Sequence, residues 1–302
     1  MKKVLLILMC CMAIQSVHAQ DTPKWADKAK KAVFSIVTYD KENKIKNTGN
    51  GFYINNNGTA LSDYSLFEDA ERAVIINADG KELPVTRIAG ANSMYDVIKF
   101  RTETEKKITA LKVATQPAAV GETVYLLPYS TQKAATCQTG KVTQVDTIAD
   151  KAYYYTLTMT TSDKTVSCPI MNANGEVLGL IQKSASEEDK ESYAIGASYG
   201  ESLSISPLSA NDINLNKIGI AKALPETEDQ ALVYLYMSSS QMDAKNYLAT
   251  LNDFLQAYPN STEGYTRRAG YYMNIGDDEH NALAEADLKK AMDVSGNKTE
   301  GQ

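Results

Sequence analysis

Histidine is scarce in this sequence, because only His18 and His280 occur among its 302 residues. Cysteine is also rare, with four residues, and two of them, Cys10 and Cys11, lie close to the N-terminus. The sequence has no basic run, and acidic residues outnumber basic ones by 37 to 31. This composition excludes the basic surface that nucleic acids and anionic membranes require. We therefore expect no nucleic-acid partner, and we expect neither a metal site nor a cofactor.

Residues 1–19 have the pattern of a secretory signal peptide. Two lysines precede an apolar stretch, residues 4–14, and Ala19 is a small residue at the expected cleavage site. This stretch is far shorter than the roughly 20 residues that cross a bilayer, and no later segment is long and apolar enough, so we expect no membrane insertion. Met9 before Cys10 argues against a lipid-modified cysteine, which normally follows a small residue. We expect a bacterial protein exported to the periplasm or secreted.

Removal of the leader takes away two lysines, so 31 − 2 = 29 basic residues face 37 acidic ones, a formal charge of −8. An acidic chain of this kind favours protein or peptide partners. Only Cys137 and Cys168 remain after cleavage. In an oxidising compartment they either form one disulfide or stay as two buried free thiols, and the sequence leaves both possibilities open.

The chain divides into a β-rich part and a helical part. Residues 20–206 contain short segments rich in Val, Ile, Thr and Tyr, separated by turn residues, which predicts an all-β domain made of one barrel or two. Three dipeptides are typical of hairpin turns: Asn57-Gly58, Asp79-Gly80 and Asn174-Gly175. Residues 207–225 are the expected linker, and residues 226–302 show the spacing of helices.

The stretch GNGFYINNNGTALS, residues 49–62, resembles the glycine-rich strand pair of trypsin-like proteases of the HtrA kind. The segment YDVIK around Asp96 is similar to the family's catalytic aspartate segment. In that family the catalytic histidine follows the strand pair, and here its place falls on Ser65. The resemblance implies a chymotrypsin-type double β-barrel in which Asp96 is the one matching member of the triad.

The segment PIMNANGEVLGL, residues 169–180, resembles the family's sequence at and beyond the end of its nucleophile motif, G-N-S-G-G-P-L. Counting back from Pro169 places Val166 where the nucleophilic serine belongs. Ser167 and Cys168 then replace the two glycines of that motif. The resemblance therefore implies a triad reduced to Ser65, Asp96 and Val166, meeting at the junction of the two barrels.

Such a site lacks the parts that serine protease chemistry requires. A serine hydroxyl is a poor nucleophile unless an adjacent base takes its proton, and in this family that base is an imidazole. His18 leaves with the signal peptide and His280 lies in the helical part, so the β-rich domain holds no histidine base. For Asp96, a structural hydrogen bond with Ser65 is the simpler interpretation.

This site is compatible with two functions. The first is a non-catalytic binding protein, a pseudo-protease, which keeps a groove and strand edges that pair with extended peptides. Tyr193, Ala194 and Ile195 look like the family's substrate-binding edge, although an ordinary core strand is the equally good alternative. The second is a serine-type or cysteine-type endopeptidase in which Ser167 or Cys168 acts as a displaced nucleophile.

The helical part resembles two tetratricopeptide repeats, residues 232–259 and 262–294. Ser261 or Thr262 is the expected cap of a helix whose first turn holds Glu263. The motif NSTEG at 260–264 returns as NKTEG at 297–301, which suggests that a third repeat begins there. Since about three repeats are needed for stability, we expect either that the helices pack on the barrels or that the chain is truncated.

Overall fold

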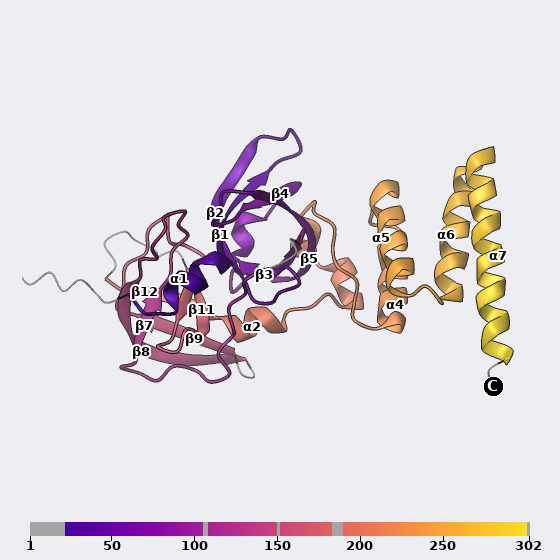
Figure 1. Ribbon diagram of the computed structural model, residues 1–302. Helices are drawn as coiled ribbons and strands as arrows, with labels where there is room; N and C mark the ends of the chain where they lie inside the picture. The colour runs from indigo at the N-terminus through magenta and orange to yellow at the C-terminus, as the bar shows by residue number, and fades with distance from the viewer. Residues whose placement is uncertain (1–21, 105–107, 150–151, 183–189, 301–302) are drawn as a thin grey trace, which may run out of the picture.

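The computed structural model describes residues 22–104, 108–149, 152–182 and 190–300. The expected signal peptide lies outside these residues. Two closed antiparallel β-barrels of six strands each come first, and a row of helices extends away from them towards the C-terminus (Figure 1). The expected order, a double β-barrel followed by an all-α region, is confirmed.

Barrel 1 closes in the order β1-β2-β3-β6-β5-β4. Its strands are β1 Val33–Tyr39, β2 Ile45–Tyr53, β3 Thr59–Ser62, β4 Arg72–Ile76, β5 Glu82–Asn92 and β6 Val97–Thr102. Residues on β1 and β6 alternate between the interior and the outer face, as half-buried strands require. The interior is filled by the fully buried side chains of Phe34, Phe52, Phe67 and Phe100.

Barrel 2 closes in the order β10-β11-β12-β9-β8-β7. Its strands are β7 Thr123–Leu126, β8 Gln138–Ala149, β9 Ala152–Leu157, β10 Pro169–Met171, β11 Val177–Ile181 and β12 Ser192–Gly196. All five residues of β11 are buried, so neither side of this strand faces solvent. The core side chains of the barrel include Val124, Leu126, Leu157, Ile170, Leu180 and Ile195.

The three predicted hairpin dipeptides all lie in turns between strands, which confirms that prediction. Gly58, Gly80 and Gly175 have φ values of +85°, +77° and +77°, a left-handed conformation that glycine adopts at little cost. Asn77 shows how the asparagine-rich turns are held, since its side-chain oxygen accepts from the backbone N–H groups of Asp79 and Lys81. These local contacts help to fix the register of the strands on either side.

The segment between the barrels and the long helices packs against both barrels at its start and against barrel 1 further along. It contains α2 (Ala197–Ser202), the 3₁₀-helix η3 (Pro207–Asn211) and α3 (Ile213–Asn216). Residues 221–223 then run beside β5, where Ile88 donates to the carbonyl of Ala221 and accepts from the N–H of Ala223. The predicted linker therefore has structure of its own and extends the packing of barrel 1.

Four helices make up the C-terminal region: α4 Glu228–Ser238, α5 Ala244–Ala257, α6 Thr262–Ile275 and α7 Asp278–Glu300. Ser261 is the N-cap of α6, because its hydroxyl accepts from the N–H of Gly264, and Glu263 lies in the first turn as expected. Gly276 ends α6 in a left-handed conformation. The prediction that a third repeat begins near Thr299 is wrong, because α7 continues without a break to Glu300.

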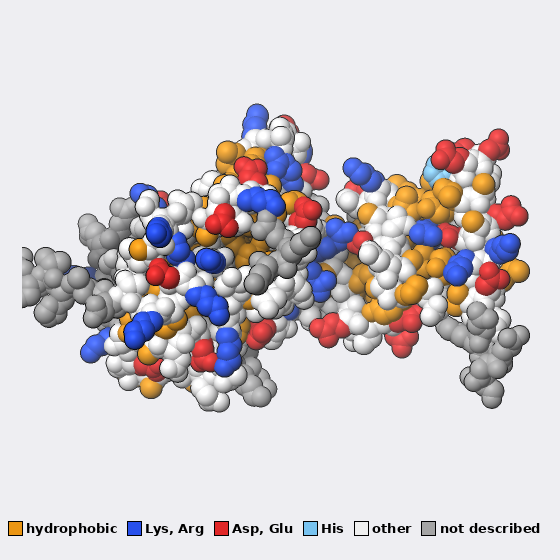
Figure 2. Space-filling view, in the orientation of Figure 1, with side chains coloured by type: hydrophobic (Ala, Val, Ile, Leu, Met, Phe, Trp, Pro, Cys, Tyr) orange, Lys and Arg blue, Asp and Glu red, His pale blue; other side chains and the backbone are white. Residues whose placement is uncertain are grey.

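The helical region exposes apolar side chains, which gather on the face shown in Figure 2. Tyr236 and Val233 of α4 are 69% and 47% exposed. The inner sides of the helices meet in a small core of their own around Leu235, Leu251 and Phe254. Among the residues that the structure describes, no helix has the length and apolarity to cross a membrane.

Candidate functional site at the barrel junction

Ser65 and Asp96 meet on the surface of barrel 1. Ser65 lies in the 3₁₀-helix η2 (Tyr64–Leu66), shortly after β3, and Asp96 lies in the turn that precedes β6. The backbone N–H and the hydroxyl of Ser65 donate to the two carboxylate oxygens of Asp96, at 2.7 and 3.0 Å. Asp96 has a φ of +48°, which aspartate tolerates better than most residues. Both oxygens of this carboxylate are thus engaged by Ser65, where the resemblance places a histidine.

Asn50 connects this side of barrel 1 to the loop that carries Val166. Its side-chain amide, buried on β2, donates to the carbonyls of Val166 and Lys164 at 2.9 and 3.1 Å. Its own carbonyl accepts from the buried hydroxyl of Ser62 at 2.6 Å. The loop before β10 is therefore tied to barrel 1 through backbone atoms. The Val166 side chain itself offers no nucleophile.

Asp63, which follows β3, is a site residue that the sequence did not reveal. It is 2% exposed, and burial together with the negative charge of Asp96 raises its pKa well above the ordinary value. The neighbouring hydroxyl of Ser167 lowers the pKa of Asp63 in part. Even so, Asp63 Oδ1 and Ser167 Oγ have no full hydrogen bond within the described part of the chain. The buried carboxyl therefore favours its protonated form.

Ser167 is fully buried and has a φ of +64°. Such a backbone is costly for most side chains and nearly free for glycine. The resemblance places a glycine of the nucleophile motif at this position, so the backbone supports the register that assigns Val166 to the serine's place. The hydroxyl of Ser167 is enclosed in the protein interior, where a substrate does not reach it.

Cys168 and Cys137 are both free cysteines, so of the two alternatives that the sequence left open, the structure contains the thiols, but only Cys168 is buried and Cys137 is partly exposed. Burial raises the pKa of the Cys168 thiol to about 12, helped by the charge of Asp63. Burial, with a contribution from Asp27, raises the pKa of Cys137 to about 11. The reactive form of cysteine is the thiolate, so these surroundings suppress nucleophilic chemistry at either residue.

The candidate peptide edge, Tyr193 to Ile195, lies on β12 between β11 and β9. Ala194 and Ile195 have paired residues on both neighbouring strands and are fully buried. The backbone N–H of Gln182 also donates to the carbonyl of Tyr193. An added peptide strand therefore has no open edge to pair with here. The segment is the inner core strand that the sequence offered as the alternative.

Gln182, which directly follows β11, joins the two barrels at the junction. Its side-chain amide donates to the carbonyl of Tyr95 at 2.7 Å, and its oxygen accepts from the hydroxyl of Tyr154 at 2.6 Å. Tyr95 also packs edge-on against Tyr199, with ring centroids 5.4 Å apart. Tyrosines and one amide thus connect the turn that carries Asp96 to barrel 2.

His280 lies far from this junction, at the start of α7. Its Nδ1 is 2.7 Å from a carboxylate oxygen of Asp277, which also accepts from the His280 backbone N–H. The Asp277 side chain thus caps the N-terminus of α7. His18 lies outside the described residues. Among those that are described, no three His, Cys, Asp or Glu side chains cluster as metal ligands do.

Residues 49–180 match the family model of the trypsin-like peptidase domain. The matched residues include strands of both β-barrels, and the helical region lies beyond them. Among solved structures it is similar to the serine endoprotease from Yersinia pestis, with 15% sequence identity and a TM-score of 0.49 over 58% of this chain. The match spans 61% of the length of that protein. No curated protein matches the sequence.

Proposed function

We propose that this chain is an exported binding protein built on a trypsin-like peptidase domain that has lost its catalytic machinery. The observation that carries the proposal is the pair of hydrogen bonds between Ser65 and Asp96. Asp96 is the residue that would orient a catalytic imidazole, and its carboxylate is instead occupied by a hydroxyl and a backbone amide. A serine hydroxyl cannot act as a general base near neutral pH.

The nucleophile's place supports the same conclusion. Val166 has an aliphatic side chain, and the bulkier Ser167 and Cys168 stand where the motif has glycines. An oxyanion hole needs backbone N–H groups that converge on one point where the substrate binds. The N–H of Val166, at the place of the serine whose own N–H helps to form this hole in the family, is instead engaged within the fold by the carbonyl of Ser162. Binding without cleavage is the function that such a domain retains.

The helical region supports a role in protein binding. Its helices resemble tetratricopeptide repeats, which bind protein segments on the surfaces of stacked helices. The exposed Tyr236 and Val233 of α4 provide apolar contact area of the kind found at protein interfaces. We propose a protein or peptide partner in the periplasm or outside the cell, because the leader has the pattern of a secretory signal peptide.

A displaced nucleophile at Ser167 is the second candidate function, and one observation favours it. Ser167 combines a left-handed backbone with an unpartnered hydroxyl next to Asp63, and such strain is common at active sites. Full burial of both side chains opposes it, because a substrate does not reach a hydroxyl enclosed in the protein interior.

Hydrolysis of casein and of a quenched fluorescent peptide pool separates the two functions. The binding-protein proposal predicts no turnover above that of a sample boiled before the assay. Steady cleavage that is proportional to enzyme and is lost in Ser167→Ala would overturn it. Trace activity from a co-purified protease is recognised because it persists in that variant.

A further inference from the structure

A cavity lies between barrel 1 and the helical region, away from the barrel junction. It has a volume of about 790 Å³, within the range typical of ligand sites, which often form where two domains meet. Strands β5 and β6 form one wall, and the end of α5 forms the opposite wall. The chain between the two domains, residues 223–226, closes the space between these walls.

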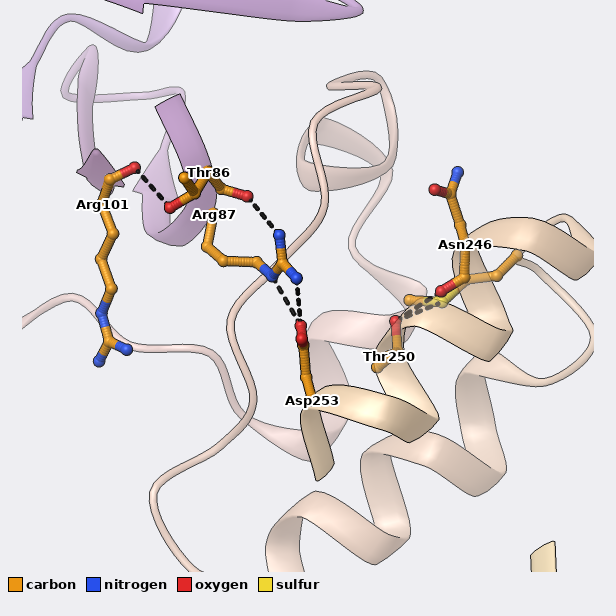
Figure 3. A network of polar contacts seen from close by, with 7 residues as sticks. Thr86, Arg87, Arg101, Asn246, Thr250 and Asp253 are labelled. Atoms are coloured by element: carbon orange, nitrogen blue, oxygen red, sulfur yellow. Dashed lines mark hydrogen bonds and ion pairs between the residues drawn. The ribbon is translucent and has the colours of Figure 1, made fainter. Parts of the chain in front are cut away.

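Arg87 of β5 is fixed in this cavity by the helical region (Figure 3). Its Nε donates to Asp253 of α5 at 2.7 Å, and one terminal nitrogen contacts the same carboxylate oxygen. The other terminal nitrogen donates to the carbonyl of Thr86 at 2.7 Å. These bonds hold the guanidinium in one orientation and satisfy its charge. They also hold the two walls of the cavity together.

Arg101 of β6 is the register partner of Arg87 on the adjacent strand. Its carbonyl accepts from the hydroxyl of Thr86 at 3.2 Å, whereas its guanidinium has no hydrogen bond or ion pair to any described residue. Figure 3 shows the Arg101 side chain extended beside the Arg87–Asp253 pair without reaching it. Like charges on directly opposed strand positions repel each other, so one arginine is neutralised here and the other is left without a counter-ion.

The other acidic group of the cavity, Glu226, forms no ion pair with Arg101 in the part of the chain that the structure describes. Glu226 interacts electrostatically with Lys99, whose pKa burial lowers and whose charged form Glu226 favours. Lys99 itself lies on β6, two residues before Arg101, and donates to the carbonyl of Glu201. The β6 side of the cavity therefore keeps the positive charge and the N–H donors of the Arg101 guanidinium.

The remaining lining is apolar or neutral and suits a chain rather than a lone ion. It consists of Ala223, Leu224, Pro225, Gln256, Ala257 and Tyr258. Small apolar side chains beside one guanidinium match a peptide that carries a single carboxylate among uncharged residues. A planar guanidinium binds a carboxylate through two parallel hydrogen bonds, which gives both strength and orientation.

We propose that this cavity binds a peptide carboxylate, with Arg101 as the residue that receives it. The carboxylate belongs either to a C-terminus or to an acidic side chain, since both present the same two oxygens. This site rests on the binding function proposed above, for which it supplies the chemistry of the ligand. The bound peptide would contact both domains at once, because the cavity is formed by both.

Fluorescence anisotropy with three pools of fluorescein-labelled hexapeptides tests the site. The first pool ends in a free carboxylate and lacks Asp and Glu, the second is the same pool with an amidated C-terminus, and the third is amidated with one internal Glu. The full chain should bind the first or the third pool and not the second. Which of the two it binds identifies the source of the carboxylate.

Arg101→Gln should weaken binding of the preferred pool by about tenfold or more, because it removes a charge-assisted hydrogen-bonding pair. Arg101→Lys keeps the charge but lacks the planar pair of donors, so its affinity should lie between those of the wild type and Arg101→Gln. Lys41→Gln is the matched control, since it removes a positive charge from an exposed turn of barrel 1 outside the cavity. Circular dichroism checks that each variant is folded.

Three results would overturn the carboxylate site: equal binding of all three pools, no binding of any pool, or unchanged binding by both Arg101 variants. None of them bears on the loss of catalysis. Mass spectrometry of the recovered peptides keeps the two proposals apart, because cut peptides would contradict the binding-protein function while intact, unbound peptides contradict only the site.

Discussion

Ser65 donates to Asp96 twice, from its backbone N–H at 2.7 Å and from its hydroxyl at 3.0 Å. This arrangement occupies both oxygens of the carboxylate at the position where the family resemblance places the aspartate that orients a catalytic histidine. Variants at Ser65 and Val166 test whether proteolysis can be restored, and a variant of the buried Asp63 tests how its carboxyl affects stability. Two other features of the molecule, the free thiols and the ion pair that holds the helices, can be tested in the same way.

Rebuilding single catalytic residues should not restore proteolysis. Val166→Ser supplies a hydroxyl without a base, and members of a triad act as a unit, so one alone contributes little. Adding Ser65→His places an imidazole beside Asp96 but leaves Ser167 and Cys168 in the glycine positions. We expect both variants to leave casein uncut over a day, as judged by gel electrophoresis. Cleavage by the double variant would mean that the oxyanion hole is intact.

Asp63 should make stability depend on pH. Its pKa is raised in the folded state, so folding favours the protonated carboxyl, and this contribution is full below the unfolded pKa of about 3.9. The contribution is lost as pH rises from there towards the raised pKa of the folded state. Asp63→Asn keeps the shape without the charge, and its amide can donate to Ser167.

Differential scanning calorimetry from pH 4 to pH 8 measures this effect. The melting temperature of Asp63→Asn relative to wild type should rise with pH, by several degrees over the range. Asp293→Asn, an exposed carboxylate of α7, should track the wild type. A difference between Asp63→Asn and wild type that stays constant with pH would show that Asp63 is ionised throughout.

The thiols should be unreactive until the protein unfolds. With pKa values of about 11 and about 12, Cys137 and Cys168 carry about one part in a thousand or less of thiolate at pH 8. We expect iodoacetamide to leave both unmodified in the native protein and to alkylate both in urea without a reductant. Peptide mapping by mass spectrometry reads the result, and a Cys137–Cys168 disulfide in the unreduced digest would contradict it.

Arg268 of α6 ties three helices of the C-terminal region together. It binds both carboxylate oxygens of Asp287 on α7 and the side chain of Asn252 on α5. Asp287 is nearly buried, so Asp287→Ala leaves a charge without its partner and should cost roughly 2–4 kcal/mol. Glu263→Ala, which removes the exposed pair with Arg267, should cost only about 0.5 kcal/mol. Urea unfolding followed by circular dichroism at 222 nm gives the free energy of unfolding of both variants. Equal losses in the two variants would refute the role of Arg268.

The parts of the fold that depend on neighbouring residues could be predicted from the sequence. Asn57-Gly58 and Asn174-Gly175 specify their turns by the backbone preference of glycine and by local asparagine side-chain contacts, and Ser261 caps α6 through a residue three positions away. The family resemblance adds the order of the two barrels and the place of Asp96.

The contacts that complete the junction could not be predicted in this way. Asn50 reaches Val166 across 116 residues, and no spacing rule connects them. Asp63 becomes unusual only because barrel closure buries it next to Asp96 and Ser167. Whether Ala194 lies on an edge or inside a barrel likewise depends on which strands pair with it, and a single segment does not contain that information.

Labelling with a fluorophosphonate probe tests the proposed loss of catalysis most directly, because the probe reacts with any activated serine whatever the substrate preference. The purified protein should show no labelling above a heat-denatured sample, while trypsin labelled in parallel reacts fully. Stoichiometric labelling that maps to Ser167 would contradict the proposal and establish a displaced nucleophile.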